Sequence, residues 1–508
     1  MKKLVFNLLL LIPCLTHAQN ATIKIDADRT VAEIDPRIYG VFMEPIQFSG
    51  KRFGLPDSVT FNTLYGTLYD PSSSLANEDG FKKNYIEAMK ELQVTNMRWP
   101  GGNFLMGYNW QDGIGPKEQR PARVNLAWGG IDNNHVGTDE WFALNKAIGS
   151  ENVVCVNLGL GDIKDAVSWL EYCNYPKGTW FSDLRAKNGH KEPYGVKIWD
   201  LGNEVDGYPW ELGYKTAGDY VKIGREAAKA MKAVDSTISL VASGSSWYEP
   251  TGKWVDWNRI VLNGLGDMVD YLSIHRYWER SDDYYEYMGQ SAMDFEEKIK
   301  VTAALIESVS AMKGYKKPIY ISVDEWGIMS RNLLSVLPIA QCFNSFLRHA
   351  DVVKMANFTL MTSLLGNDRE KGTFKTPLFY IFKAYSNNCR GRTIDSYVNC
   401  ETFNTPAFKN IPYLDVTATY SSDKKEAFIN VVNRHKAKAI TTDIISTSGE
   451  FTGKATCSLV AGTSLNDTFE FDKQNQYVPV TKEVNAKGNK FTYTFPPHSF
   501  TQIRIAVK

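Results

Sequence analysis

Two glutamates could supply the pair of carboxyl groups that hydrolysis of a glycosidic bond requires. Glu204 follows the apolar run Val196–Leu201, and Glu325 follows the apolar run Ile319–Val323. In this chemistry one carboxyl group protonates the departing oxygen, while the other attacks the anomeric carbon or activates water. A separation of about 5 Å gives retention of configuration, whereas about 6.5–9.5 Å gives inversion. Isolated Asn-Glu or Asp-Glu pairs are usually solvated surface groups, so the hypothesis depends on both glutamates lying where a strand ends.

Other polar side chains lie at the ends of neighbouring apolar runs. Arg98 and Asn103 come at and just after one of them, and His275 and Tyr277 at and just after another. Hydrogen bonds from His275 and Tyr277 could keep a nucleophilic carboxylate ionised. Asn203, beside the first glutamate, could hold the sugar 2-hydroxyl, a contact that strengthens in the transition state.

Eight short apolar runs, with helical patterns between them, predict how these residues are positioned. The alternation is typical of parallel βαβ units and predicts an α/β protein with a (β/α)₈ TIM barrel, although a doubly wound open sheet stays possible. In a barrel, catalytic groups lie at the C-terminal ends of the strands. The runs are Ile38–Phe42, Val94–Arg98, Val153–Leu158, Val196–Leu201, Ile238–Ala242, Tyr271–His275, Ile319–Val323 and Val352–Leu360, and the clearest helical patterns are Phe81–Leu92, Ala217–Val234 and Phe295–Met312.

The pattern changes after residue 390, where short alternating runs are separated by Gly, Asn, Asp, Ser and Lys. This predicts a C-terminal antiparallel β-sandwich, jelly-roll-like, over residues 391–508, after a barrel over residues 37–390. Residues 19–36 are predicted to form one or two strands that join the sandwich. The expected strands are Tyr413–Thr419, Ala427–Val432, Ile440–Ile445, Ala455–Leu459, Tyr477–Thr481 and Phe491–Phe495.

The first residues have the pattern of a cleaved targeting signal. Lys2 and Lys3 precede the apolar run Leu4–Ile12, and small residues at Thr16 and Ala18 offer a cleavage site. The apolar run is too short for a membrane helix, which needs about 20 residues. We therefore expect a signal peptide over residues 1–18, export to the periplasm or the cell exterior, and no membrane attachment after cleavage.

Composition excludes several other classes of function. The chain has 57 basic and 57 acidic residues, so it lacks the basic excess that a nucleic-acid partner requires. The six cysteines after residue 18 form no CxxC motif and the histidines form no HExxH motif, so no metal site is indicated. Gly159-Leu160-Gly161 has Lys164 where a dinucleotide loop needs its third glycine, and neither a P-loop nor a GxSxG motif occurs.

A longer series of motifs resembles the α-L-arabinofuranosidases of glycoside hydrolase family 51. Their order and spacing agree from residue 37 to residue 385. The resemblance implies a barrel with a C-terminal β-sandwich and a retaining double displacement, which needs no metal or organic cofactor. The matching motifs include Met97-Arg98-Trp99-Pro100-Gly101-Gly102-Asn103-Phe104, Gly137-Thr138-Asp139-Glu140-Trp141, Trp199-Asp200-Leu201-Gly202-Asn203-Glu204-Val205-Asp206-Gly207, Ser273-Ile274-His275-Arg276-Tyr277 and Asp324-Glu325-Trp326.

The resemblance also implies a role for each matching residue. Glu204 would be the general acid/base and Glu325 the nucleophile. The other implied contacts are Asn203 with the 2-hydroxyl, His275 and Tyr277 beside the nucleophile, Arg98 and Asn103 in the pocket for a terminal arabinofuranose, and Glu44 with sugar hydroxyls.

Two departures from the family pattern bear on the choice of sugar. After Glu44 the family usually continues His-Leu-Gly, whereas this chain has Pro45-Ile46-Gln47. Thr376 takes the place of a sugar-binding glutamine. Some members of the family act on β-glucans or xylosides.

The leading hypothesis is therefore an exported, retaining, exo-acting hydrolase that releases terminal α-L-arabinofuranosyl residues from arabinose-containing plant polysaccharides or oligosaccharides. An endo-β-glycanase or xylosidase on the same barrel is one alternative. A non-catalytic carbohydrate-binding protein is another, although a binding protein needs no acid/nucleophile pair. Members of the family often form homo-oligomers, but the sequence indicates no interface.

Overall fold

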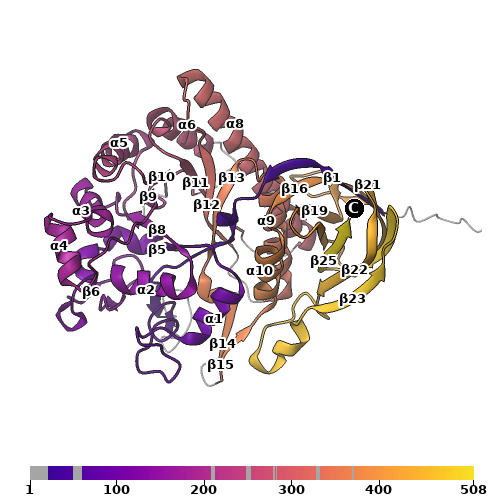
Figure 1. Cartoon of the computed structure of the whole chain (residues 1–508), viewed down its shortest axis with the longest axis horizontal. Helices are drawn as coiled ribbons and strands as arrows, with labels where there is room; N and C mark the ends of the chain where they lie inside the picture. Colours follow the sequence, from indigo (N-terminus) through magenta and orange to yellow (C-terminus); the bar gives the residue numbers. More distant parts are fainter. Residues whose placement is uncertain are drawn as a thin grey trace, which may run out of the picture.

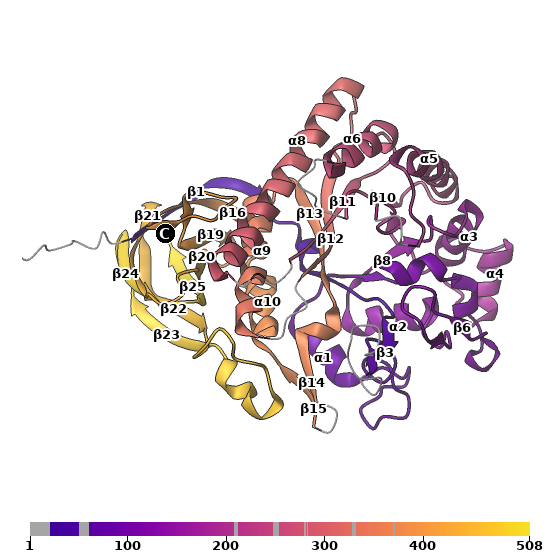
Figure 2. The same cartoon turned by 180° about the vertical axis from the view of Figure 1, so that it is seen from behind.

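The computed structural model describes residues 21–49, 60–207, 212–246, 253–278, 281, 283–327, 332–368 and 371–508 (Figure 1). The predicted signal peptide, residues 1–18, lies outside the described residues. Within them the chain forms a barrel and a large β-domain, with two helices between them (Figures 1 and 2).

Eight parallel strands close into a barrel, which confirms the predicted TIM barrel and excludes the open sheet. The last strand pairs with the first, with Asn357 opposite Gly40. Nearly every strand residue is buried, because the strands face side chains on one surface and helices on the other, which is why their sequences are continuously apolar. The strands are β2 (Gly40–Phe42), β5 (Asn96–Trp99), β8 (Glu151–Val156), β9 (Ile198–Leu201), β10 (Ser239–Ala242), β11 (Tyr271–Tyr277), β12 (Tyr320–Gly327) and β13 (Val353–Thr359).

Helices cover the barrel, and the three predicted helical patterns all form. Their ends carry the expected signals: the Thr216 side chain accepts a hydrogen bond from the Asp219 backbone at the start of α5, and Gly314 ends α8 in a left-handed conformation. The helices are α1 (Lys83–Glu91), α2 (Thr138–Ile148), α3 (Ile163–Asn174), α4 (Trp180–Lys187), α5 (Ala217–Val234), α6 (Lys253–Leu265), α7 (Tyr284–Gly289), α8 (Phe295–Lys313), α9 (Val336–Arg348) and α10 (Pro377–Asn388). A short π-helical turn, η6 (Gln290–Asp294), joins α7 to α8.

The β-domain is one nine-stranded sheet that curls over its own core. Cys457 and Phe491 lie in strands near opposite ends of the sheet order yet belong to the same buried cluster, so the sheet encloses a sandwich-like interior. In sheet order the strands are β23 (Val480–Asn485), β22 (Phe451–Val460), β25 (Ser499–Val507), β20 (Glu426–Asn433), β19 (Leu414–Ser421), β16 (Arg392–Asn399), β1 (Ala21–Glu33), β21 (Ile440–Ser448) and β24 (Lys490–Phe495).

The N-terminal strand β1 is part of this sheet, although the whole barrel separates it from the other strands in sequence. It pairs antiparallel with β16 and parallel with β21, so the sheet is not wholly antiparallel as the sequence predicted. The strand predicted at Tyr477–Thr481 begins later, because Phe471–Tyr477 forms a 3-10 helix.

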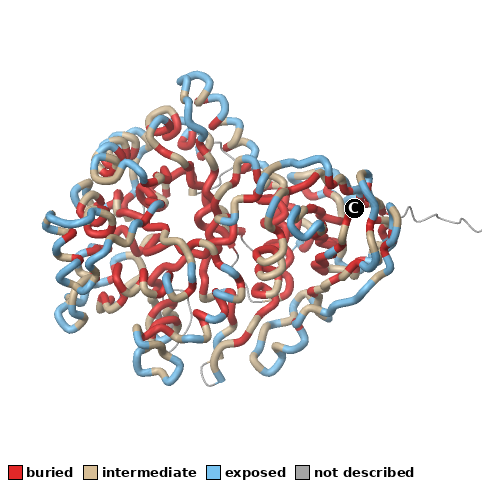
Figure 3. Tube along the Cα trace, viewed as in Figure 1, coloured by how far each residue is buried: buried red, intermediate tan, exposed pale blue. Residues whose placement is uncertain are grey.

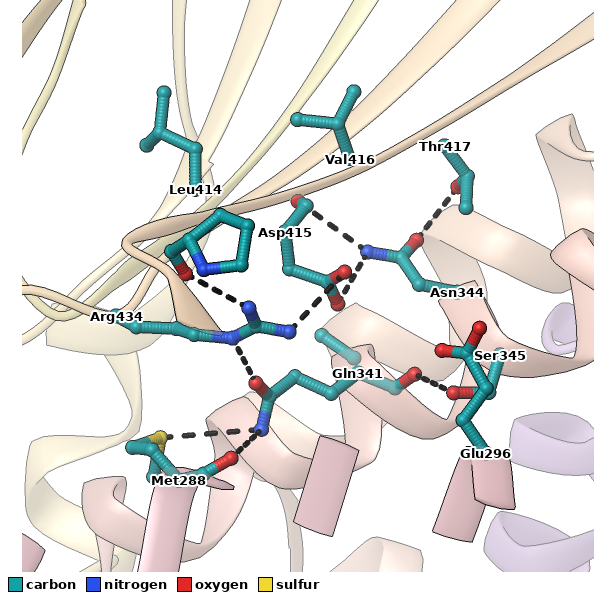
Figure 4. A network of polar contacts seen from close by, with 12 residues as sticks. Met288, Glu296, Gln341, Asn344, Ser345, Leu414, Asp415, Val416, Thr417 and Arg434 are labelled. Carbon is teal, nitrogen blue, oxygen red and sulfur yellow. Dashed lines mark hydrogen bonds and ion pairs between the residues drawn. The ribbon is translucent and has the colours of Figure 1, made fainter. Parts of the chain in front are cut away.

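Helix α9 lies between the barrel and the β-domain and is buried from Val336 to Leu347 (Figures 1 and 3). Apolar side chains of the β-domain, Phe428 and Phe500 among them, belong to the same buried cluster as the barrel. Polar contacts cross this contact region as well: Asn344 of α9 donates to Asp415 of β19 at 3.0 Å (Figure 4). The two parts are therefore held together by shared apolar burial and by directional contacts.

Short hairpins extend from the barrel mouth, namely β3 (Gln47–Ser49) with β4 (Thr60–Asn62), β6 (Arg123–Val124) with β7 (Ile131–Asp132), and β14 (Leu365–Asp368) with β15 (Gly372–Lys375). Among the described helices, none combines the length and the apolar character needed to cross a bilayer.

Candidate active site

The two glutamates predicted from sequence meet at the C-terminal end of the barrel. One carboxyl oxygen of Glu204 and one of Glu325 lie within 4.8 Å of each other. Glu325 lies in β12 and is 4% exposed. Glu204 follows β9 in a turn where its own φ is +44°, a left-handed conformation that costs a non-glycine residue about 1–2 kcal/mol. Such conformations persist where the surrounding structure enforces them, often at functional sites.

An irregularity in β12 brings two consecutive acids into the site. Between β11 and β12, Ser273 is opposite Ser322 but His275 is opposite Glu325, so β12 contains one extra residue. A bulge of this kind re-aims side chains that would otherwise alternate between the two faces. As a result Asp324 contacts His275 Nε2 at 3.2 Å, while Glu325 contacts Tyr277 and Arg98.

Arg98 contacts several of the acidic side chains and is only 1% exposed. Its Nη1 donates to Glu325 Oε1 at 2.9 Å, and its Nη2 donates to Asn203 Oδ1 at 2.8 Å. Its Nε donates to Asp200 at 2.5 Å and lies 3.4 Å from Asp324. Arg98 was expected to line the sugar pocket, but these contacts use its guanidinium to hold and neutralise the carboxylates.

His275 lies closer to Glu204 than to the nucleophile side where it was expected. Its Nδ1 is 2.9 Å from Glu204 Oε1 and 3.8 Å from Glu325 Oε2. Burial opposes the charged imidazolium, but the charges of Glu325 and Asp324 outweigh burial and raise the pKa of His275 well above its ordinary value. A protonated His275 therefore faces a carboxyl oxygen of Glu204.

Tyr277 contacts Glu325, on the side where the sequence placed it. Its hydroxyl donates to Glu325 Oε2 at 2.7 Å and lies 3.0 Å from the Thr359 hydroxyl. Burial raises the pKa of Glu325, and the charge of Glu204 adds to this effect. The charges of His275 and Arg98 and the Tyr277 hydrogen bond act in the opposite direction and favour the ionised form.

Glu44 lies in a tight cradle beside the two glutamates. Its Oε1 accepts hydrogen bonds from the Phe104 backbone at 2.8 Å and from the Trp128 indole at 2.6 Å. A Cβ on Gly102 would lie 2.1 Å from the Glu44 carboxyl group, so only glycine fits there. Burial and the nearby charge of Glu325 raise the pKa of Glu44 well above its ordinary value. Sequence reasoning missed Trp128, which lies in the loop between β6 and β7, where no periodic pattern marks a site.

Two asparagines carry buried polar atoms without a protein partner. Nδ2 of Asn203 and Oδ1 of Asn103 are both in this state. An unsatisfied buried polar atom costs about 1–3 kcal/mol, so each is a candidate for a substrate hydroxyl. Thr376 differs: its hydroxyl donates to the Leu364 carbonyl at 2.9 Å and is used within the fold at the start of α10. The Pro45 carbonyl likewise accepts from Asn125 of the β6–β7 loop.

Glu204, His275 and Glu325 also have the spacing of a metal-ligand set. A metal ion needs an imidazole nitrogen without a proton. Both ring nitrogens of His275 already face carboxyl groups, Nδ1 that of Glu204 at 2.9 Å and Nε2 that of Asp324 at 3.2 Å, and the raised pKa of His275 favours the protonated ring. These residues therefore fit an ion-paired acid cluster better than a metal site.

A cavity of about 480 Å³ lies at the opposite end of the barrel, where the strands begin. Its lining includes Arg37 and Glu151, which form an ion pair at 2.8 Å, and Tyr271, Tyr320 and Lys354. None of the predicted site residues lines this cavity. The chemistry belongs at the C-terminal ends of the strands, as in other barrels of this type.

Comparison with known proteins agrees with this geometry. A family model described as α-L-arabinofuranosidase 1 domain matches residues 88–297, and one described as α-L-arabinofuranosidase C-terminal domain matches residues 324–499. The chain is 36% identical over 446 residues to an intracellular exo-α-(1→5)-L-arabinofuranosidase of Halalkalibacterium halodurans, covering 83% of this chain and 86% of that one. It is 33% identical to the Bacillus subtilis intracellular exo-α-(1→5)-L-arabinofuranosidase 1, covering 96% and 99%.

Solved structures give the same result over nearly the whole chain. An arabinose complex of α-L-arabinofuranosidase from Thermotoga maritima has a TM-score of 0.85 at 31% identity, covering 95% of this chain and 99% of that one. A thermostable GH51 α-L-arabinofuranosidase from Thermotoga petrophila has a TM-score of 0.84 at 31% identity, with the same coverage of both chains.

The relatives contradict the predicted export. Both curated relatives are named intracellular enzymes, and so is a third from Acetivibrio thermocellus at 35% identity. The prediction rested on two lysines, a short apolar run and small residues at Thr16 and Ala18, and such a pattern does not by itself establish a cleaved leader. With the barrel, the β-domain and the paired glutamates in place, the comparisons show that this chain is a glycoside hydrolase and belongs to the α-L-arabinofuranosidases of family 51.

Proposed function

We propose that this enzyme releases terminal α-L-arabinofuranosyl residues with retention of configuration, using Glu204 as general acid/base and Glu325 as nucleophile. The observation that carries the proposal is the approach of the two carboxyl groups, one oxygen of each lying within 4.8 Å of the other. Retaining glycosidases hold these groups about 5–5.5 Å apart, whereas inverting enzymes leave about 6.5–9.5 Å for a water molecule.

In the first step a Glu325 oxygen attacks the anomeric carbon while Glu204 gives its proton to the departing oxygen. The new bond joins Glu325 to the sugar, and the glycosidic bond breaks. Arg98 and Tyr277 each contact one Glu325 oxygen, so the carboxylate is held in one orientation for attack. The imidazolium of His275 stabilises the carboxylate that Glu204 becomes after it loses its proton.

In the second step Glu204 takes a proton from water as the water attacks the anomeric carbon. The bond to Glu325 breaks, and both carboxyl groups return to their starting states. Attack on opposite faces in the two steps gives overall retention.

Recognition of the terminal sugar would use the polar groups that border the carboxylates. The unpartnered Nδ2 of Asn203 suits the 2-hydroxyl, and the unpartnered Oδ1 of Asn103 and the carboxyl group of Glu44 suit other ring hydroxyls. Thr376 does not contribute in this proposal, because its hydroxyl is already used by Leu364. The exo-α-(1→5)-L-arabinofuranosidase activity for which the relatives are named supports arabinofuranose as the terminal sugar.

Neither alternative from the sequence is favoured. A bifunctional glucanase-xylanase, CelM2, shares a TM-score of 0.60 at 13% identity, which supports the fold alone. A binding protein without activity would not need the acid pair or the network that fixes it. Assembly into homo-oligomers stays a prediction, which light scattering would test.

The direct test is the stereochemistry of the first product. Proton NMR during hydrolysis of an aryl α-L-arabinofuranoside should show the α-anomer first, with mutarotation to the equilibrium mixture afterwards. A first-formed β-anomer would overturn the double displacement. A panel of aryl glycosides that differ only in the sugar should show arabinofuranoside preferred over xyloside and glucoside by about 100-fold or more, since the site's buried polar groups would be left unpaired with the wrong sugar.

A further inference from the structure

Lys298 is a fully buried lysine for which the proposed mechanism has no use. It lies in the first turn of α8, is 0% exposed, and has its ammonium 5.6 Å from the centre of the Trp254 ring. Its Nζ donates to two backbone carbonyl groups, that of Ser245 at 3.1 Å and that of His275 at 3.0 Å. Burying an ammonium is costly unless it makes such contacts, so its presence requires a reason.

These two carbonyl groups lie where the barrel ladder has stopped. The pairing between β10 and β11 ends with Ala242 opposite Leu272, three residues before His275. Beyond that point the His275 N–H donates to the Ser245 carbonyl at 3.2 Å, and Lys298 contacts both residues. Lys298 therefore continues the connection between the two strands after the regular hydrogen bonds end.

The alternation of side chains along β11 explains why this matters for the site. His275 and Tyr277 point inward to the catalytic carboxyl groups, whereas Arg276 points to the helical layer and pairs with Asp294 at 2.9 Å. Asp294 ends the π-helical turn that leads into α8, and Lys298 lies one turn further on. The start of α8 thus holds the end of β11 at two successive residues.

We propose that Lys298 is a positioning residue for the acid/base step, holding the His275 main chain so that the imidazole stays in contact with Glu204. The contact it would maintain is the 2.9 Å approach of His275 Nδ1 to Glu204 Oε1. The inference rests on the proposed role of Glu204, and Lys298 itself touches neither substrate nor the reacting atoms.

The charged groups around Lys298 are compatible with this role. Burial, helped by the charge of Arg276, lowers the pKa of Lys298 to about 7, and the charges of Asp206, Asp294 and Glu204 act in the opposite direction. A neutral amine still has two N–H groups and can donate to both carbonyl groups. Neither protonation state therefore excludes the positioning contact.

The test compares substrates with different need for acid assistance. Lys298→Met keeps the length of the side chain and removes the hydrogen bonds to the Ser245 and His275 carbonyl groups. We expect kcat/KM on an arabino-disaccharide, a poor leaving group, to fall about tenfold or more, since small misplacement of a catalytic group is costly. On a nitrophenyl arabinofuranoside, which needs little protonation, kcat/KM should fall about threefold or less, because kcat/KM reports the first step and not the second, in which Glu204 acts as base on every substrate.

Thr302→Val is the matched control, because Thr302 is buried one turn further along α8 and its hydroxyl has no protein partner. It should leave both rates near the parent values. If Lys298→Met lowers kcat/KM equally on both substrates, Lys298 only supports the fold and the proposal is wrong.

Glu204→Gln, alone and combined with Lys298→Met, separates this inference from the proposed function. If Glu204→Gln itself shows no dependence on the leaving group, the assignment of Glu204 as acid fails. If Glu204→Gln shows that dependence, Lys298→Met should add little in the Glu204→Gln background, because the two changes act through one step. Fully additive losses would overturn the positioning role while leaving Glu204 as the acid.

Discussion

At the scale of single residues, the products formed with added azide should distinguish the roles of Glu204 and Glu325. Glu204→Ala should be slowest on poor leaving groups, and added azide should replace water in the second step and give an α-L-arabinofuranosyl azide, with retained configuration. Glu325→Ala should lose turnover by about 10⁴-fold or more, and azide should attack the substrate directly and give the β-azide. NMR of the azide products checks both; the opposite pattern would exchange the two roles, and circular dichroism shows whether each variant stays folded.

Tyr277→Phe should change the pH dependence as well as the rate. In the parent, the hydrogen bond from Tyr277 favours the ionised form of Glu325. Removing that hydrogen bond should therefore raise the pKa of Glu325 further and move the acidic limb of kcat/KM to higher pH. A hydrogen bond to a charged group contributes about 1.5–3 kcal/mol, which corresponds to about a 10- to 150-fold loss of kcat/KM. An unchanged acidic limb would mean that Tyr277 does not act through Glu325.

The residues that sequence could predict are those at strand ends, and the ones it missed act through contacts that no spacing reveals. Glu204, Glu325 and Tyr277 follow apolar runs, so their common location follows from the barrel. The contact of Asp324 with His275, beside that of Glu325 with Tyr277, depends on the extra residue in β12, which the sequence does not mark. Trp128 lies in a loop without a periodic pattern. Lys298 lies in a helix whose sequence resembles that of any amphipathic helix.

At the scale of elements, the eight barrel strands were predictable because burial on both faces makes their sequences continuously apolar. Two strands of the β-domain, β16 and β25, were not predicted. In β16 two consecutive residues, Thr393 and Ile394, are buried, so burial does not alternate along the strand. Strand β25 buries Gln502, whose amide donates to Asn430 at 2.7 Å. A polar residue that is buried with a partner breaks the expected alternation, so the pattern alone does not show the strand.

Asp415 of β19 neutralises two arginines beside α9, the buried Arg434 and the partly exposed Arg348. Arg348 of α9 contacts Asp415 at 2.8 Å. Arg434 contacts the same carboxyl group at 3.2 Å (Figure 4). Asp415→Ala leaves both cations without this partner and should lower the free energy of unfolding by about 3–5 kcal/mol. Asp395→Ala removes an exposed ion pair with Arg29 and should cost about 0.5 kcal/mol or less. Urea or thermal unfolding measures both, and equal effects would show that the Asp415 contacts add nothing.

At the scale of the whole molecule, the barrel and the β-domain share one region of burial around α9, while Glu204 and Glu325 lie at the barrel mouth. The N-terminal strand β1 strengthens this arrangement, because it lies inside the β-domain sheet, between β16 and β21, and the chain then runs through a short 3-10 helix into β2 of the barrel. The ends of the barrel segment are therefore fixed in one sheet. Loss of contacts at α9 should thus affect the stability of both parts together.

The same contact region should make the molecule sensitive to acid through Glu296 of α8. Burial opposes its ionisation, but the charge of Arg348 and the nearby His349 lower the pKa of Glu296 far below the ordinary 4.5. A carboxyl group with a lowered pKa in the folded state stabilises that state above pH 4.5, and this contribution is lost as pH falls further.

Glu296→Gln should therefore lower the Tm at pH 7, and the difference from the parent should shrink as pH falls from about 5 to 3. Glu297→Gln, an exposed neighbour, is the control and should change the Tm little at any pH. A difference for Glu296→Gln that stays constant down to pH 3 would mean that Glu296 stabilises the fold by packing and not by its charge.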